Sequence, residues 1–257
     1  MEKFILFSRQ RSGSTVLIRS LDQHPDVLCG GELFNNDDGI HRLEWQFPFI
    51  NFVKNTPLNI NTIKNLSLNR LLNVPWGLIR TNSHLSEYYS QANMNKFKAA
   101  GFKLMLSHTK LFPVTKRWLK RKDMKRIVLV RENPLEIFIS HLKSQKDGYS
   151  HLSRGEKRSD RQVNVNTSIL KRRLKKIERD NRYLKAISQN CDSLLINYNE
   201  LFNWNKLLAK IFRYLEIEDT KIEPVLEKRS KPKFKDNVSN YDEVTKFLND
   251  TKYEKYI

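Results

Sequence analysis

The stretch "FILFSRQRSGSTVLIRSL", residues 4–21, decides the fold of this chain. The apolar run Phe4–Phe7 predicts a buried strand, and the apolar spacing across Thr15–Gln23 predicts a helix. The polar segment Ser8–Gly13 lies between them, and its final glycine permits a tight turn because it has no Cβ atom. A buried strand, a tight loop and a helix in this order are typical of α/β folds that hold an anion at the carboxyl end of a parallel strand.

Later parts of the chain repeat the alternation of strands and helices. Further short apolar runs predict buried strands at Phe102–Leu106, Arg126–Val130 and Ser193–Asn197. Helical spacing predicts helices at Pro134–Lys146, Val165–Gln189, Trp204–Leu215 and Tyr241–Leu248. Buried strands that alternate with helices indicate a parallel sheet. We therefore expect an α/β fold, a three-layer sandwich with a central parallel sheet.

Two segments depart from this alternation. Residues 35–100 are rich in Asn with scattered aromatic residues, and we expect helices and loops inserted there between the first and second strands. Residues 143–161 are polar and basic, and they predict a mobile loop. No Gly/Ser-rich or Pro-rich linker interrupts the sequence, so residues 1–257 are expected to form a single domain.

The net charge of +19 favours anionic partners, such as nucleic acid, acidic lipid, a polyanionic glycan or a highly charged cofactor. A compositional bias toward Lys explains part of this excess. One face of the expected helix at 165–190 is basic, through Lys171, Arg172, Lys175, Lys176, Arg179 and Arg182. This face is either an ordinary solvated surface or a surface that steers an anionic substrate.

The cysteine content and the hydropathy pattern limit the class of protein further. Cys29 and Cys191 form neither a disulfide framework nor a metal-ligand pattern. The chain begins with too short an apolar run for a signal peptide, and no run approaches the roughly 20 apolar residues of a membrane span. We expect a cytoplasmic protein without a transmembrane segment.

The loop after the first strand has the groups that bind an anion. The main-chain N–H groups of Ser12–Thr15 precede or begin a helix, whose dipole favours negative charge. Ser14 and Thr15 add hydroxyl donors, and Arg11 adds a planar cation suited to oxyanions. A polar loop that merely begins an ordinary helix is the alternative. The loop lacks the Gly-Lys-Ser/Thr ending of an ATP-binding P-loop, and no apolar run ends in an Asp that could hold Mg²⁺. The pattern favours anion exchange without a metal over ATP chemistry.

A second group of candidate residues lies in "RIVLVRENPLEIFISHLKSQ", residues 126–145. Arg131 ends the expected strand, and Pro134 stands at a favourable first-turn position of the next helix. Ser140 follows about two helical turns later. Arg131 and Ser140 could converge on a second phosphate, or they could be an exposed Arg and a helix-surface Ser.

Together these two groups resemble the nucleotide-binding elements of sulfotransferases that use 3′-phosphoadenosine 5′-phosphosulfate (PAPS). In that family a basic residue before Ser-Gly-Ser/Thr-Thr grips the 5′-phosphosulfate, as Arg11 with Ser12, Gly13, Ser14 and Thr15 would here. A strand-end Arg and a helical Ser, here Arg131 and Ser140, grip the 3′-phosphate. The resemblance implies a P-loop NTPase-like fold and transfer of a sulfuryl group from PAPS to an acceptor hydroxyl, with 3′,5′-ADP as product and no metal.

Other stretches are similar to the same family. They are "LDQHPDVLCGGELF" at 21–34, "INYNELF" at 196–202 and "SKPKFKDNVSNYDEV" at 230–244, whereas residues 35–100 match nothing in it. By resemblance, Lys228 and Arg229 reach the nucleotide phosphates, although an exposed basic pair would look the same. Residues 35–100 and 143–161 would then shape the acceptor site.

The resemblance also implies a general base for the acceptor hydroxyl. Glu32 is the first candidate, because it follows Gly30-Gly31 and matches the family's Glu after a His-Pro-Asp segment. His108, just after the second expected strand, is the rival, and Lys103 could face the leaving group. The implied acceptor is a small molecule or a glycan, including anionic ones, and no nucleic acid is expected. The alternatives are a P-loop kinase that uses ATP and Mg²⁺, and a nucleic-acid-binding protein that uses the basic helix.

Overall fold

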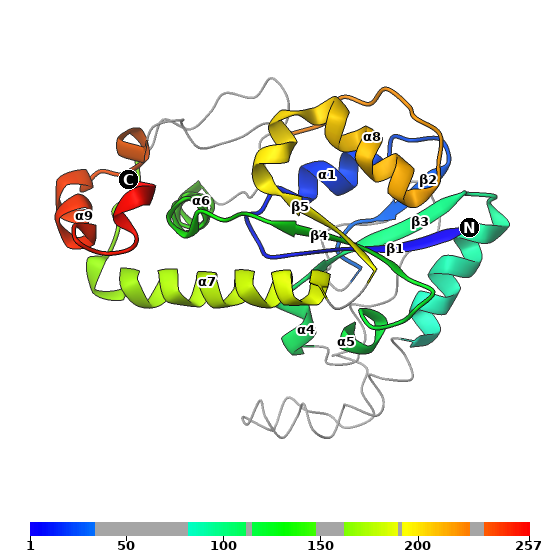
Figure 1. Cartoon of the computed structure of the whole chain (residues 1–257), viewed down its shortest axis with the longest axis horizontal. Coiled ribbons are helices and arrows are strands. Elements are labelled where there is room, and N and C mark those ends of the chain that lie inside the picture. The colour runs from blue at the N-terminus through cyan, green and yellow to red at the C-terminus, as the bar shows by residue number, and fades with distance from the viewer. Residues whose placement is uncertain (34–81, 112–114, 148–161, 190–191, 227–233) are drawn as a thin grey trace.

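The computed structural model describes residues 1–33, 82–111, 115–147, 162–189, 192–226 and 234–257 (Figure 1). Its centre is a five-stranded sheet in the order β2-β3-β1-β4-β5, and every neighbouring pair is parallel. The strands are β1 (Glu2–Ser8), β2 (Val27–Gly30), β3 (Ala99–Met105), β4 (Lys125–Val130) and β5 (Ser193–Asn197). The predicted α/β fold with a central parallel sheet is confirmed.

Helices cover both faces of this sheet, which makes three layers (Figure 1). One face packs against α1 (Ser14–Leu21) and α8 (Trp204–Leu215), whose apolar residues share a core with β1 and β4. The other face packs against the helix at 82–94, α5 (Thr115–Trp118) and α7 (Thr167–Gln189). Short helix α4 (His108–Leu111) follows β3 on this second side.

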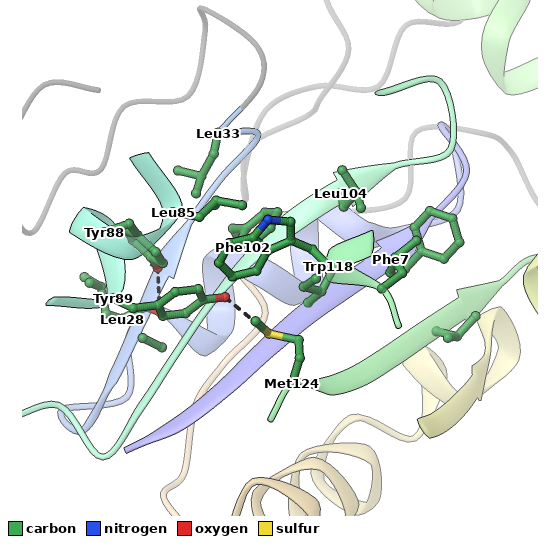
Figure 2. Close-up of a cluster of buried hydrophobic side chains, with 14 of the residues drawn as sticks. Phe7, Leu28, Leu33, Leu85, Tyr88, Tyr89, Phe102, Leu104, Trp118 and Met124 are labelled. Carbon is green, nitrogen blue, oxygen red and sulfur yellow. Dashed lines mark hydrogen bonds between the residues drawn. The ribbon is translucent and has the colours of Figure 1, made fainter. Parts of the chain in front are cut away.

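Two tyrosines of the helix at 82–94 fix the edge of the sheet (Figure 2). The Tyr88 hydroxyl accepts a hydrogen bond from Gly30 N at 2.9 Å and donates to the main-chain oxygen of Gly101 at 2.7 Å. It therefore bridges β2 and β3. Burial raises the pKa of the Tyr88 hydroxyl well above its usual value, so the group stays a neutral donor. Tyr89 stacks on Trp118 with ring centroids 6.2 Å apart.

A separate apolar core joins α6 (Pro134–Asp147), α7 and α9 (Tyr241–Leu248) beyond the carboxyl ends of the strands (Figure 1). Buried Leu170, Leu174 and Ile177 of α7 supply one side of it. The short helix η4 (Phe234–Asn237) is tied to α6, because buried Lys143 donates to Asn237 Oδ1 at 2.7 Å. The N-terminal half of α7 thus lies next to the sheet edge where ligands of such folds bind.

The structure corrects several expected boundaries. A strand that the pattern did not predict, β2, lies within residues 21–34, so the long segment that follows lies between β2 and β3 and not between the first two strands. Its residues 82–94 form a helix that packs in the core. Residues 143–147 are the last turn of α6 and not part of a loop. The remainder of that expected loop, 148–161, and residues 35–81 lie outside the described residues, as do Lys228 and Arg229.

Candidate active site

The loop between β1 and α1 is bent by two residues in the left-handed region. Arg11 has a φ of 66° and Gly13 a φ of 87°. The Ser12 hydroxyl donates to the main-chain oxygen of Arg9 at 2.6 Å and closes the turn. The φ of Gly13 favours glycine, and a Cβ atom there would lie 2.5 Å from Leu201 Cδ1, so the Leu201 side chain would have to move.

The N-terminus of α1 faces the carboxyl end of the sheet and carries the expected hydroxyls. Ser14 and Thr15 form its first turn, and both are buried. In the part of the chain that the structure describes, no side chain caps this helix. The first N–H groups of a helix have no partner within the helix, and its dipole favours an anion. The first turn of α1 therefore supplies main-chain and hydroxyl donors together.

The two expected phosphate-binding groups lie in contact. Arg11 Nε donates to Ser140 Oγ at 3.1 Å, which joins the loop to α6. Arg131 Nη1 donates to the main-chain oxygen of Arg11 at 3.1 Å. The loop that carries Arg11 thus meets the segment that carries Arg131 and Ser140. The two lie far apart in sequence and come together at the carboxyl ends of β1 and β4.

Arg131 is itself a buried support of the loop. Its side chain is 5% exposed, its Nη2 donates to Glu136, and its guanidinium lies 4.2 Å from the ring centroid of Tyr198. Its Nε is buried and has no hydrogen-bond partner among the described atoms. Asn181 of α7 donates to the main-chain oxygen of Arg131 at 2.8 Å. These contacts fix the side chain of Arg131, which binds the main-chain oxygen of the left-handed residue Arg11.

The surroundings of the loop are strongly cationic. Arg9 pairs with Asp180 of α7, with 3.3 Å between Nε and Oδ2. His141, next to Ser140 on α6, has its pKa lowered first by burial and then by the positive charges of Arg11, Arg9, Arg173 and Lys176. Neighbouring cations disfavour the charged imidazole. A negative ligand at this place would be attracted by all of these groups.

A chain of polar contacts leads from the loop to the candidate bases. Lys103 on β3, whose side chain is 1% exposed, donates to Thr15 Oγ1 at 2.9 Å and pairs with Glu32 Oε1 at 3.0 Å. Glu32 Oε2 lies 3.5 Å from His108 Nε2. Glu32 and His108 are therefore neighbours in one cluster, with the buried Lys103 between Glu32 and the anion-binding loop.

His108 is held as a neutral imidazole. Burial is the main cause that lowers its pKa, with Lys103 acting in the same direction and Glu32 against it. The Met105 N–H points at its Nδ1 across 3.4 Å. If Nδ1 accepts this hydrogen, Nε2 carries the ring proton and donates it toward Glu32.

The structure thus brings together the expected site residues that it describes. Arg11, Ser12, Gly13, Ser14 and Thr15 form the loop, with Arg131 and Ser140 on one side of it and Glu32 and His108 on the other. Sequence reasoning did not identify Asn181 or Tyr198 as supports of Arg131. Both leave a trace in the sequence: Asn181 interrupts the apolar stripe of α7, and Tyr198 follows the carboxyl end of β5.

Within the described ranges, no group of three or more His, Cys, Asp and Glu side chains is placed to hold a metal ion. The same ranges contain no helix that is both long and apolar enough to span a membrane.

Comparisons with known proteins find similarity in structure but not in sequence. No protein-family model matches the chain, and no curated protein matches it. Among solved structures, the chain is similar to a sulfotransferase from Alicyclobacillus acidocaldarius, with a TM-score of 0.48 and 12% identity, over 96% of this chain and 91% of that one. What the site can do follows from its own residues.

Proposed function

We propose that this protein is a PAPS-dependent sulfotransferase that transfers a sulfuryl group to an acceptor hydroxyl on a carbohydrate, a lipid or a natural product. One observation carries the proposal. A single series of contacts runs from Ser140 through Arg11 and the loop to Thr15, and from there through Lys103 to Glu32 and His108. It combines two sites for anions with an acid–base group beside them.

The donor set of the site fits a nucleotide with a phosphate at each end. The first turn of α1 and the Arg11 guanidinium would hold the 5′-phosphosulfate, since main-chain N–H groups and Arg suit oxyanions. Ser140 and Arg131 would hold the 3′-phosphate, while Arg131 also binds the main-chain oxygen of Arg11. PAPS supplies the sulfuryl group and leaves as 3′,5′-ADP.

Glu32 is the proposed base of the reaction. It takes the proton of the acceptor hydroxyl while the hydroxyl oxygen bonds to sulfur and the bond from sulfur to the bridging phosphate oxygen breaks. Lys103 and Arg11 stabilise the negative charge that develops on the leaving phosphate. A positioned base of this kind contributes a factor of about 10²–10⁴ to the rate.

The contacts of His108 favour Glu32 over His108 as the base. Nδ1 of His108 faces the Met105 N–H, and Nε2 faces Glu32, so both ring nitrogens have protein partners. A carboxylate oxygen can accept more than one hydrogen bond, so Glu32 can accept from Lys103, from His108 and from an acceptor hydroxyl. We assign His108 the role of orienting Glu32.

Thermal unfolding with three ligands tests the proposal against its rivals. A ligand that binds only the folded protein, at about 100 times its dissociation constant, adds about 2.7 kcal/mol to the free energy of unfolding. We expect that shift with 3′,5′-ADP and no comparable shift with ATP plus Mg²⁺ or with an oligonucleotide. A shift with ATP plus Mg²⁺ and none with 3′,5′-ADP would indicate a kinase and overturn the proposal.

A further inference from the structure

The solvent-facing side of α7 carries an excess of positive charge that no other described residue neutralises. Its exposed basic residues include Lys171, Arg172, Lys175 and Arg179, and in the described ranges none of these four forms an ion pair. The two carboxylates of α7 have partners on other elements. Glu178 binds Lys252 and the Tyr253 hydroxyl, and Asp180 binds Arg9.

These residues line a shallow groove of about 760 Å³, which we call the α7 groove. Its basic lining on α7 consists of Lys171, Arg172, Lys175, Lys176, Arg179 and Arg182. Among the described residues of the lining, Glu178 is the one acidic residue, and none is aromatic or has a large apolar side chain. Lys171 to Arg182 spans about 16 Å at the helical rise per residue, which is long enough for several charged groups of a linear polymer.

The α7 groove lies on the helix that contacts the candidate active site, because Asp180, next to the groove residue Arg179, pairs with Arg9 of the loop at 3.3 Å. Lys176 lines the groove, and its positive charge, with that of Arg173, helps to lower the pKa of His141. His141 adjoins Ser140, which accepts a hydrogen bond from Arg11. Helix α4, which carries His108, lies on the same side of the sheet as α7 (Figure 1). Positive charge therefore leads along α7 toward the loop at which the transfer is proposed.

We propose that the α7 groove binds an anionic polysaccharide, bearing carboxylate or sulfate groups, and that this polymer carries the acceptor hydroxyl. The inference rests on the proposed function. The basic groove needs an anionic ligand and the sulfuryl transfer needs a hydroxyl, and an anionic polysaccharide has both groups. Single-stranded nucleic acid is disfavoured because such sites use aromatic side chains for base stacking. A lipid surface is disfavoured because the lining has no apolar group to insert.

The test compares two charge-matched variants of the full chain. The groove variant carries Lys171→Gln, Lys175→Gln and Arg179→Gln. The control variant carries Lys206→Gln, Lys221→Gln and Lys246→Gln, which are exposed residues outside α7. Both lose the same net charge, and Gln is close to Lys and Arg in helix propensity, so folding should be retained. Circular dichroism and binding of 3′,5′-ADP check that the fold and the nucleotide site are intact.

Fluorescence anisotropy then measures binding of labelled hyaluronan, chondroitin sulfate, neutral dextran and duplex DNA as a function of salt. We expect the wild type to bind an anionic polysaccharide and not dextran, and the groove variant to bind it about tenfold more weakly or worse at low salt. The affinity of the groove variant should also depend less steeply on salt, because fewer charge pairs remain to be screened. The control variant should bind like the wild type.

Several results would overturn the inference. An equal loss in both variants would mean that net charge alone attracts the polymer. Tighter binding of duplex DNA than of either anionic polysaccharide, lost in the groove variant, would assign the groove to nucleic acid. If 3′,5′-ADP fails to bind while the groove variant loses polysaccharide, the proposed sulfotransferase function fails but the binding surface stands. If 3′,5′-ADP binds and no anionic polysaccharide does, only the acceptor class is wrong.

Discussion

Arg11 Nε donates a hydrogen bond to Ser140 Oγ across 3.1 Å, and this contact joins the loop after β1 to the helix after β4. The two residues are far apart in sequence, and the parallel sheet brings them together because β1 and β4 are neighbours. Arg131 follows β4, and its Nη1 donates a hydrogen bond to the main-chain oxygen of Arg11. The two groups of residues that we propose bind anions are therefore in contact through Arg11.

Arg11→Ala should weaken the binding of 3′,5′-ADP by at least about tenfold, because the guanidinium is proposed to hold the 5′-phosphate. A hydrogen bond to a charged group contributes about 1.5–3 kcal/mol. Isothermal titration calorimetry measures the loss. Arg213→Ala, an exposed arginine on α8, is the control and should bind normally. Undiminished binding by Arg11→Ala would remove Arg11 from the nucleotide site.

Glu32→Gln should keep the affinity for 3′,5′-ADP and lose about 10²–10⁴ of the turnover rate, because the amide cannot take the acceptor proton. Lys103→Met should lower turnover as well, since it removes the cation between Thr15 and Glu32. Steady-state kinetics with PAPS and a hydroxyl acceptor measure the turnover rate of each variant. Full activity of Glu32→Gln would shift the role of base to His108.

The free energy of unfolding should fall as the pH falls below about 6.5, the ordinary pKa of His. The pKa values of His108 and His141 are both lowered in the folded protein, mainly by burial. The unfolded chain therefore binds more protons than the folded one in this range, and acid favours unfolding. Urea unfolding between pH 7 and pH 5 should show a shallower decline in His108→Gln and in His141→Gln. A decline as steep as in the wild type would contradict this assignment.

Gly13→Ala should destabilise the fold by about 1–3 kcal/mol, the usual cost of a strained backbone. The φ of 87° disfavours any Cβ, and the new methyl would lie 2.5 Å from Leu201 Cδ1. A double-mutant cycle with Leu201→Ala separates the two causes, because Leu201→Ala relieves the contact and leaves the strain. If Gly13→Ala unfolds at the wild-type urea concentration, the loop does not have this conformation.

The sequence predicts the position of a strand correctly where apolar residues continue along most of its length. The bounds of β5 are as expected, and β1 was found from Phe4–Phe7. The start of β3 was missed because Ala99-Ala100-Gly101 has little apolar bulk. Its small side chains are a packing requirement, since a Cβ on Gly101 would lie 2.4 Å from the ring of Phe4. β2 is short and lies between a proline and a glycine, so its pattern resembled a loop.

The sequence predicted that the site residues lie together at the carboxyl end of the sheet, but it did not predict their partners. Glycine, hydroxyl and basic residues after strand ends indicate an anion site in a parallel sheet. That Arg131 donates to the Arg11 main chain and stacks on Tyr198 depends on where the short helix η3 (Tyr198–Phe202) packs. Burial of Lys143 against Asn237 depends likewise on the packing of η4 on α6. Such contacts join segments whose separation in sequence carries no periodic signal.

The most direct measurement of the central claim is the affinity of the wild type and of Ser140→Ala for 3′,5′-ADP and for 5′-AMP. If Arg131 and Ser140 form a second anion site for the 3′-phosphate, that phosphate should add at least about tenfold to the affinity of the wild type, which is about 1.4 kcal/mol. Ser140→Ala should lose most of that gain and bind 5′-AMP as the wild type does. Equal affinity of the wild type for the two nucleotides would contradict the account.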